Sequence, residues 1–401
     1  MKSASQAKRA LFLLTAVNYL NYIDRYILAA VLVSIKKDLS LSDFQAGLLA
    51  TAFMMPYMLT APIFGWLGDS TARSKILGFG AALWSIATFV TGMSKSFMTM
   101  MASRFTLGLG ESAFTTVSVP FLSDFFPAEK RGRILSIFSS ALPVGAALGY
   151  VLGGLLGASV GWRNAFFIVG FPGLILAFLL MRLKDPRKTQ EKSKYSIKEL
   201  TSVLRSSQSY LFATFGYCAY TFVVGGIAHW IPSFIQRTYG LSELSANTLF
   251  GGIAVGSGLF GTLAGGYLGD HLDKKSPGGH LRISAISMLF ALPFFWFCVQ
   301  SDQLNIFVIF LALTQFCFFL STSPINVALL HSVPYRHRNS AIALAIFACH
   351  MLGDAISSPL IGMYSDATGS LKNGILMCTP VIMIAVVLWW LGANKSTRME
   401  N

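Results

Sequence analysis

The chain has 401 residues, of which 54% are hydrophobic and only 12% are charged. Soluble proteins carry about 25% charged residues, so this composition excludes a water-soluble enzyme, a nucleic-acid-binding protein and a secreted disulfide scaffold. The formal net charge is +14, and in a membrane protein such an excess is typical of Lys and Arg concentrated in cytoplasmic loops. The sequence therefore predicts an integral membrane protein with no nucleic-acid partner.

Apolar runs long enough to cross a bilayer, which takes about 20 residues, follow one another in two groups. The first six lie near 10–34, 45–68, 76–94, 97–123, 134–159 and 163–183. A basic polar stretch occupies 184–208, and six more runs lie near 209–235, 245–269, 282–300, 303–331, 339–364 and 374–392. We expect an all-α integral membrane fold of 12 transmembrane helices in two pseudo-symmetric six-helix bundles, over 1–183 and 209–401, joined by a cytoplasmic basic linker over 184–208.

The basic residues predict the orientation of these helices. With the N-terminus placed in the cytoplasm, 23 of the 31 Lys and Arg residues fall inside, six fall outside and two fall within spans. Cytoplasmic loops are enriched in Lys and Arg, so both termini are expected to be cytoplasmic. The compact loops favour a multi-pass protein of the cell inner (plasma) membrane, with an organellar membrane as the alternative. We expect a monomer in contact with membrane lipids.

A repeated motif links the two halves of the chain. Gly65-Trp66-Leu67-Gly68-Asp69 follows the second apolar run, and Gly266-Tyr267-Leu268-Gly269-Asp270 follows the eighth, 201 residues later. A period of this size indicates a duplicated six-helix unit. Twelve spans in two groups of six, with this motif after the second span and Arg73 and Lys75 close behind it, resemble the major facilitator superfamily of transporters.

The motif also predicts where the cytoplasmic side is gated. The resemblance implies that both copies organise cytoplasmic gates, in which a carboxylate pairs with Arg or with a helix N-terminus. The predicted gating residues are Asp69, Arg73, Arg131, Arg133 and Asp270, with Arg131 and Arg133 as candidate partners for Asp69. Ser70 stands where that superfamily usually has a basic residue, so the first copy is degenerate.

Besides the short stretches Gly161-Trp162-Arg163 and Ser365-Asp366, four longer stretches are similar to the Spinster branch of that superfamily. They are Asn21-Tyr22-Ile23-Asp24-Arg25, Gly108-Leu109-Gly110-Glu111-Ser112, His350-Met351-Leu352-Gly353-Asp354 and Ser358-Pro359-Leu360-Ile361-Gly362. The first also occurs in symporters of sugar acids and organic anions, whereas the combination with the third and fourth is more specific. Because Spinster proteins are implicated in moving lysophospholipids and sphingoid lipids, the resemblance implies an amphipathic lipid substrate.

Six residues that can ionise fall well within the predicted spans. A charge at the centre of a span costs about 2.5–3.5 kcal/mol on insertion scales, so each one needs a partner or a function. Their spacing groups them, because residues four or seven apart share a helix face. Asn21 and Arg25 share a face of span 1 beside Asp24, Arg104 and Glu111 share a face of span 4, and His350 and Asp354 are four apart in span 11. We expect these helices to face one central cavity.

The function of these residues has two interpretations. In the first, Asp24 and Glu111 exchange a proton as the cavity alternates, while the substrate-binding residues are Arg25, Arg104, Asn21, His350 and Asp354. In the second, a permanent ion pair joins span 1 to span 4. The spacing does not decide which carboxylate meets which arginine.

The remaining patterns limit the chemistry. There is no G-x-x-x-x-G-K-[ST] motif, no metal-ligand spacing and no catalytic constellation in the sequence. We therefore expect no enzyme activity, no cofactor and no metal. The preferred interpretation is a secondary active transporter that moves a lysophospholipid, a sphingoid or a related amphipathic lipid by alternating access, with proton coupling. The alternatives are a proton-coupled symporter of a small organic anion or sugar acid, and a lipid-binding membrane receptor that does not transport.

Overall fold

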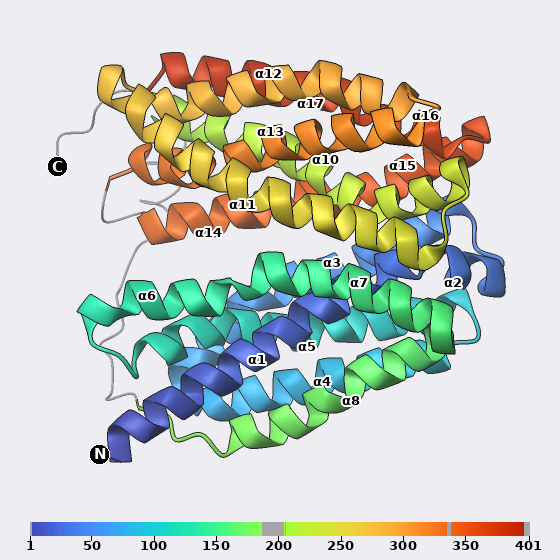
Figure 1. The fold of residues 1–401 in the computed structure, drawn as a ribbon. Coiled ribbons are helices and arrows are strands. Elements are labelled where there is room, and N and C mark those ends of the chain that lie inside the picture. The colour runs from blue at the N-terminus through green and yellow to red at the C-terminus, as the bar shows by residue number, and fades with distance from the viewer. Residues whose placement is uncertain (1, 187–203, 205, 335–337, 397–401) are drawn as a thin grey trace. The chain divides into compact units, whose positions relative to one another are not determined.

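The computed structural model describes residues 2–186, 204, 206–334 and 338–396, and among them side chains are described except at 2–4, 69–70, 128–129 and 338–340. Every regular element in this part of the chain is a helix (Figure 1). The helices of the first half are α1 (Lys2–Ala30), α2 (Leu32–Leu39), α3 (Asp43–Ser70), α4 (Arg73–Met93), α5 (Phe97–Ser123), α6 (Ala128–Ser139), α7 (Ala141–Val160) and α8 (Trp162–Met181).

The second half begins with four long helices and continues with a broken one. Its elements are α10 (Gln208–Tyr239), α11 (Glu243–Lys275), α12 (Gly279–Gln300), α13 (Leu304–His331), α14 (Arg338–Cys349), the π-helical turn η2 (His350–Asp354), α15 (Ala355–Thr368), α16 (Leu371–Leu376) and α17 (Cys378–Asn394). The predicted span 339–364 thus corresponds to α14, η2 and α15 together. A π-turn inside an α-helix is rare and is found mostly at functional positions.

Ten helical segments of the described chain are long and apolar enough to cross a membrane. They match ten of the predicted spans. The other two predicted spans, 10–34 and 97–123, coincide with α1 and α5, which are long helices as well but are not among the ten. These two helices carry Asp24, Arg25, Arg104 and Glu111. The all-helical membrane fold is confirmed, and the count of twelve spans stays a prediction.

The described residues separate into two compact units. Of the described residues, 2–186 and 231–251 belong to one unit, and those within 204–230 and 252–396 belong to the other. The end of α10 and the beginning of α11 therefore belong to the first unit. The predicted domain boundaries at 183 and 209 stay predictions.

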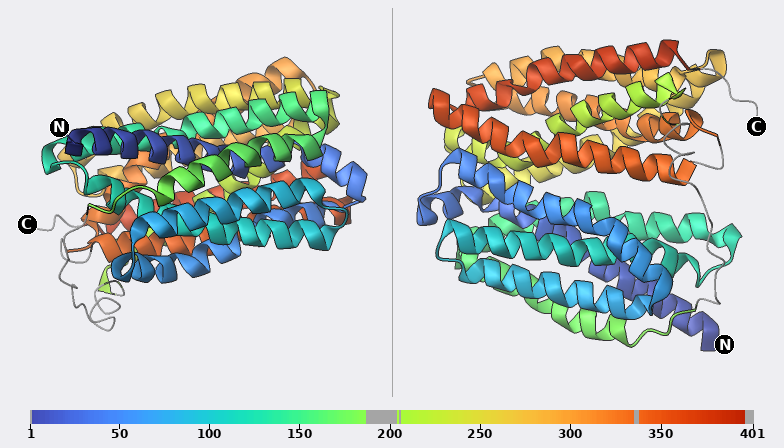
Figure 2. Two further views of the ribbon diagram at one scale, coloured as in Figure 1. Left: turned by 90° about the horizontal axis from the view of Figure 1, so that it is seen from below. Right: turned by 180° about the vertical axis from the view of Figure 1, so that it is seen from behind.

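In the first unit α7 packs along α1, and the two helices run side by side in Figures 1 and 2. A stripe of glycines on α7 allows this packing. Gly145, Gly149 and Gly153 recur every four residues, so they lie on one helix face. A Cβ added at Gly149 would lie 2.9 Å from Cβ of Tyr26, and one added at Gly153 would lie 2.5 Å from Cβ of Ala30. Small residues at this spacing let membrane helices approach closely, and here the approach fixes the register of α1.

Close approaches also place α5 against α3 and α4. A Cβ at Gly108 would lie 2.2 Å from the carbonyl oxygen of Phe53 in α3, and one at Gly110 would lie 2.7 Å from the carbonyl oxygen of Gly80 in α4. Because α5 also contacts α1, its polar side chains Arg104 and Glu111 are enclosed by helices of the same bundle, and both are buried. This enclosure positions the site described next.

Candidate functional site

An ion pair joins α1 to α5 inside the first unit. Arg25 Nη2 lies 2.8 Å from Glu111 Oε2, and the side chains are 17% and 0% exposed. Of the pairings that the sequence left open, the structure therefore shows Arg25 with Glu111. Charge-assisted hydrogen bonds of this length are among the stronger polar interactions in proteins.

Aromatic rings surround the Arg25 guanidinium. Its Cζ lies 5.3 Å from the ring centroid of Tyr22, 4.9 Å from that of Phe53 and 5.1 Å from that of Tyr57. The Cζ of Arg104 lies 5.2 Å from the ring centroid of Phe53. All these distances are within the range of cation–π attraction. Sequence reasoning missed Phe53 and Tyr57 because aromatic residues are abundant in this chain and most of them pack helices or face lipid.

Asp24 and Arg104 lie in the same bundle but are not engaged in ion pairs with any described residue. Asp24 is 1% exposed and lies beside Thr88 and Trp84 of α4. Arg104 is 2% exposed, and its Nε and Nη1 have no hydrogen-bond partner among the described residues. Among the described residues, α1 and α5 therefore bring together one ion pair, Arg25 with Glu111, and two ionisable groups without an ion-pair partner, Asp24 and Arg104.

Asn21 completes the polar groups that α1 contributes to this cluster. It is fully buried and lies beside Glu111. Asn18, one turn earlier, donates from Nδ2 to the carbonyl oxygen of Phe138 at 3.0 Å and so belongs to helix packing instead. The predicted residues of spans 1 and 4, namely Asn21, Asp24, Arg25, Arg104 and Glu111, are thus brought together.

The predicted polar residues of span 11 form a pair of their own in the second unit. His350 Nδ1 lies 3.1 and 3.0 Å from the two carboxylate oxygens of Asp354, and the two side chains are partly buried. Both residues belong to the π-turn η2. A Cβ at Gly225 of α10 would lie 2.3 Å from Cβ of Asp354, so α10 packs directly on this turn. That the pair shares a cavity with Arg25 and Glu111 stays a prediction.

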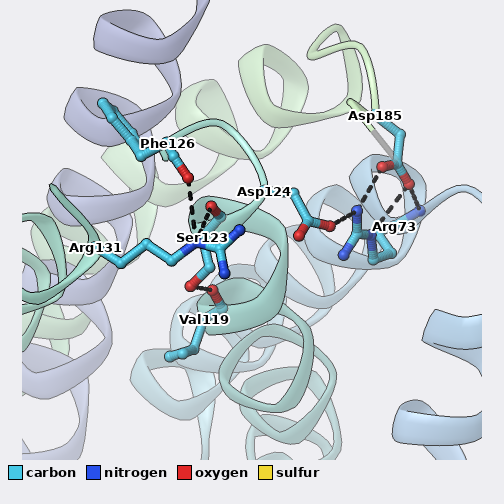
Figure 3. A network of polar contacts seen from close by, with 7 residues as sticks. All are labelled: Arg73, Val119, Ser123, Asp124, Phe126, Arg131 and Asp185. Atoms are coloured by element: carbon cyan, nitrogen blue, oxygen red, sulfur yellow. Dashed lines mark hydrogen bonds and ion pairs between the residues drawn. The ribbon is translucent and has the colours of Figure 1, made fainter. Parts of the chain in front are cut away.

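The predicted gating residue Arg73 anchors a carboxylate network at one end of the first unit (Figure 3). Its Nη2 lies 2.7 Å from Asp124 Oδ2 and 2.7 Å from Asp185 Oδ1, and its Nε donates to Asp185 Oδ2 at 3.2 Å. Neither acidic residue was predicted. Asp124 and Asp185 each lie just after the end of a predicted span, at 123 and 183. An acidic residue in an otherwise basic loop was the sequence feature that could have identified them as partners of Arg73.

The other predicted gating residues have different outcomes. Arg131 Nε donates to the carbonyl oxygens of Ser123 and Phe126, both at 3.1 Å (Figure 3). Arg133 is exposed. The Asp69 side chain lies outside the described residues, so its pairing with Arg131 or Arg133 stays a prediction.

Ionic contacts also join the loop regions of the first unit where α2 ends and α10 ends. Arg237 donates through two nitrogens to the two oxygens of Asp43, each at 2.9 Å, and Lys36 pairs with the same carboxylate. Arg163 pairs with Asp38. The hydrogen bond from Arg163 lowers the pKa of the Asp38 carboxyl below its ordinary value.

Long apolar helices that enclose a buried ionic cluster define a polytopic membrane protein, and comparisons with known proteins identify its family. The family model of the Major Facilitator Superfamily matches residues 14–358. The chain is 31% identical to "Sphingosine-1-phosphate transporter SPNS2" of Danio rerio, over 87% of this chain and 74% of that protein. It is 29% identical to "Probable sphingolipid transporter spinster homolog 2" of Arabidopsis thaliana, over 96% of this chain and 86% of that protein.

A solved structure shows the same fold. It is that of a bacterial homolog of the human lysosomal transporter Spinster, in an inward-facing and unoccupied conformation. The TM-score is 0.89 at 20% identity, over 98% of this chain and 99% of that one. The chain is also 32% identical to "Protein spinster homolog 3" of Danio rerio, over 89% of this chain and 76% of that protein. It belongs to the major facilitator superfamily and, within it, to the Spinster family. It is a multi-pass membrane transporter and not an enzyme, as the sequence predicted.

Proposed function

We propose that this transporter moves a lysophospholipid, a sphingoid or a related amphipathic lipid by alternating access, with protons as the coupling ion. The substrate class is supported by the relatives whose names describe sphingolipid or sphingosine-1-phosphate transporters. The observation that carries the mechanism is the Arg25–Glu111 ion pair beside the buried, unpaired Asp24.

The Arg25–Glu111 pair acts as a switch that responds to protonation. Protonation of Glu111 removes the negative charge that holds Arg25 and frees the guanidinium to move or to bind an anion. Asp24 lies within electrostatic reach of Glu111 and Arg104, so gaining or losing its proton changes the electrostatic potential at both groups. The Glu111 carboxylate lies within reach of both Arg25 and Arg104, so it is suited to linking proton movement to a change of conformation.

Arg104 is suited to the anionic part of the substrate. Its planar guanidinium has a fixed fork of donors that matches phosphate and carboxylate, and two of its nitrogens are buried without a partner among the described residues. Phe53 provides apolar surface beside Arg104, and Tyr57 provides it beside Arg25. We include Asn21, Arg25, His350 and Asp354 in the proposed substrate-binding set.

The proposed function depends on the membrane arrangement that the sequence predicted. We propose that α1 and α5 span the membrane together with the ten apolar segments, which gives twelve spans. Both termini then lie in the cytoplasm, and the protein acts as a monomer in the cell inner (plasma) membrane. In this arrangement the Arg73 network and Asp270 lie on the cytoplasmic side, where they contribute to gating.

The test is uptake of a labelled lysophospholipid into proteoliposomes, with and without an imposed pH gradient. We expect the wild type to respond to the gradient and Asp24→Asn to lose that response. The matched control is Asp302→Asn, which neutralises an exposed carboxylate between α12 and α13 and should transport like the wild type.

The other outcomes separate the rival functions. Lipid flux that ignores the gradient in both proteins would remove the proton mechanism and retain lipid transport. Gradient-driven uptake of a small organic anion, without lipid flux, would favour the anion symporter. Lipid binding without any flux would favour a receptor.

A further inference from the structure

Three side chains of the types that bind metal ions meet at the ends of three helices in the second unit. Asp273 lies near the end of α11, His280 in the first turn of α12 and His331 at the last position of α13. One ligand atom from each residue lies within 4.8 Å of the other two. This cluster plays no part in the proposed transport site.

The turn between α11 and α12 brings the first two residues together. Gly278 has φ +81°, which favours glycine and reverses the chain. The next residue, Gly279, donates its backbone N–H to Asp273 Oδ1 at 3.0 Å. This hydrogen bond orients the carboxylate and leaves Oδ2 available, 4.0 Å from Nδ1 of His331.

His280 is the fixed member of the cluster. Its side chain is 5% exposed, and its Nδ1 is buried without a hydrogen-bond partner among the described residues. Its Nε2 lies 3.7 Å from Asp270 Oδ1, so a second carboxylate flanks the same ring. Nδ1 packs against Gly269 of α11, where an added Cβ would lie 2.6 Å from it, so the ring is held in place on that side.

We propose that Asp273, His280 and His331 form a binding site for a divalent transition metal of the Zn²⁺ type. Zn²⁺ binds histidine nitrogen and carboxylate oxygen at about 2.0–2.2 Å in tetrahedral geometry, so neighbouring ligand atoms lie about 3.4 Å apart. Closing the present spacing of up to 4.8 Å requires a shift of about 1.4 Å. The His331 side chain is 57% exposed and Asp273 is 29% exposed, so both can move toward the buried His280.

The donor set determines which metals fit. Two imidazoles and one carboxylate favour Zn²⁺, Co²⁺ or Ni²⁺, whereas Mg²⁺ and Ca²⁺ prefer sites made only of oxygen ligands. A bound ion would join the ends of α11, α12 and α13, which are otherwise held here by side-chain packing and by the turn.

The test uses the full-length protein without a polyhistidine tag, purified and treated with a chelator. Zn²⁺ is titrated in competition with a chromophoric chelator, and Co²⁺ is followed by visible absorption. We expect one equivalent of tight binding, a tetrahedral Co²⁺ spectrum and no competition from millimolar Mg²⁺. His331→Ala should weaken Zn²⁺ binding at least about tenfold, because loss of even an outer partner of a metal ligand costs 10- to 100-fold.

The control removes a histidine from the same helix that lies outside the proposed metal site. His271 is also in α11 and exposed, and its ring stacks on Tyr267, so His271→Ala should bind Zn²⁺ like the wild type. Asp273→Asn, which keeps the size of the side chain, should weaken binding as His331→Ala does. Absence of tight Zn²⁺ binding in the wild type would overturn the proposal, as would equal binding by wild type, His331→Ala and Asp273→Asn.

Discussion

Variants of the Arg25–Glu111 pair can distinguish a role in proton coupling from a role in holding α1 against α5. Glu111 is fully buried and its partner lies 2.8 Å away, so Glu111→Gln or Arg25→Met leaves one charge without its counterion. Removing one partner of a buried ion pair costs about 3–5 kcal/mol. Both single variants should therefore unfold at lower temperature than the wild type and should transport poorly.

The double variant Arg25→Met with Glu111→Leu gives the decisive result. Replacing both members of a buried pair by apolar residues of similar volume is often neutral or stabilising, so its thermal stability in detergent should return to or exceed that of the wild type. If the pair is a proton-coupling element, uptake in proteoliposomes should nevertheless show no response to a pH gradient. A double variant that is stable and keeps the full gradient response would show that the pair is only a structural link between α1 and α5.

Two further predictions concern stability. Gly153→Leu should destabilise the protein by about 1–3 kcal/mol by overpacking, because even a Cβ would lie 2.5 Å from Cβ of Ala30. The control Gly252→Leu should not destabilise it, since no atom lies within 4 Å of a Cβ added at Gly252. Thermal unfolding of the two variants checks this, and equal melting temperatures would refute it. Asp38 has a pKa lowered by Arg163, so its contribution is present at neutral pH and lost as the pH falls below its ordinary value of 3.8. The melting temperature of Asp38→Asn should be slightly lower than that of the wild type at pH 7, and the difference should vanish in acid; a difference that grows in acid would contradict the sign.

The predicted helices agree with the structure wherever a continuous apolar run alone determines where a helix begins and ends. The run 303–331, for example, coincides with α13 at Leu304–His331. Breaks inside apolar runs were missed. The chain divides at Val31 between α1 and α2, at Ser140 between α6 and α7 and at η2 in span 11, because hydrophobicity reports the solvent around a helix and not its local hydrogen bonding.

The site was predicted as a set of residues and not as a set of contacts. Helical spacing selected Arg25 and Glu111, but they are 86 residues apart, and only tertiary packing decides that they meet. The same holds for Asp43 and Arg237, which are 194 residues apart. His280 and His331 gave no metal signal in the sequence, because ligand spacing is recognisable only when a short loop carries the ligands.

The distribution of charge between α1 and α5 argues against an ion pair as the whole function. A structural link needs two charges, yet these helices carry Asp24, Arg25, Arg104 and Glu111. At about 2.5–3.5 kcal/mol each, four such residues cost about 10–14 kcal/mol on insertion scales. The pair offsets part of the cost for Arg25 and Glu111, whereas Asp24 and Arg104 have no ion-pair partner in the described part of the chain. A purely structural ion pair leaves the cost of burying Asp24 and Arg104 unexplained. A transport site gives each a function, because Asp24 can exchange a proton and Arg104 can bind an anionic group.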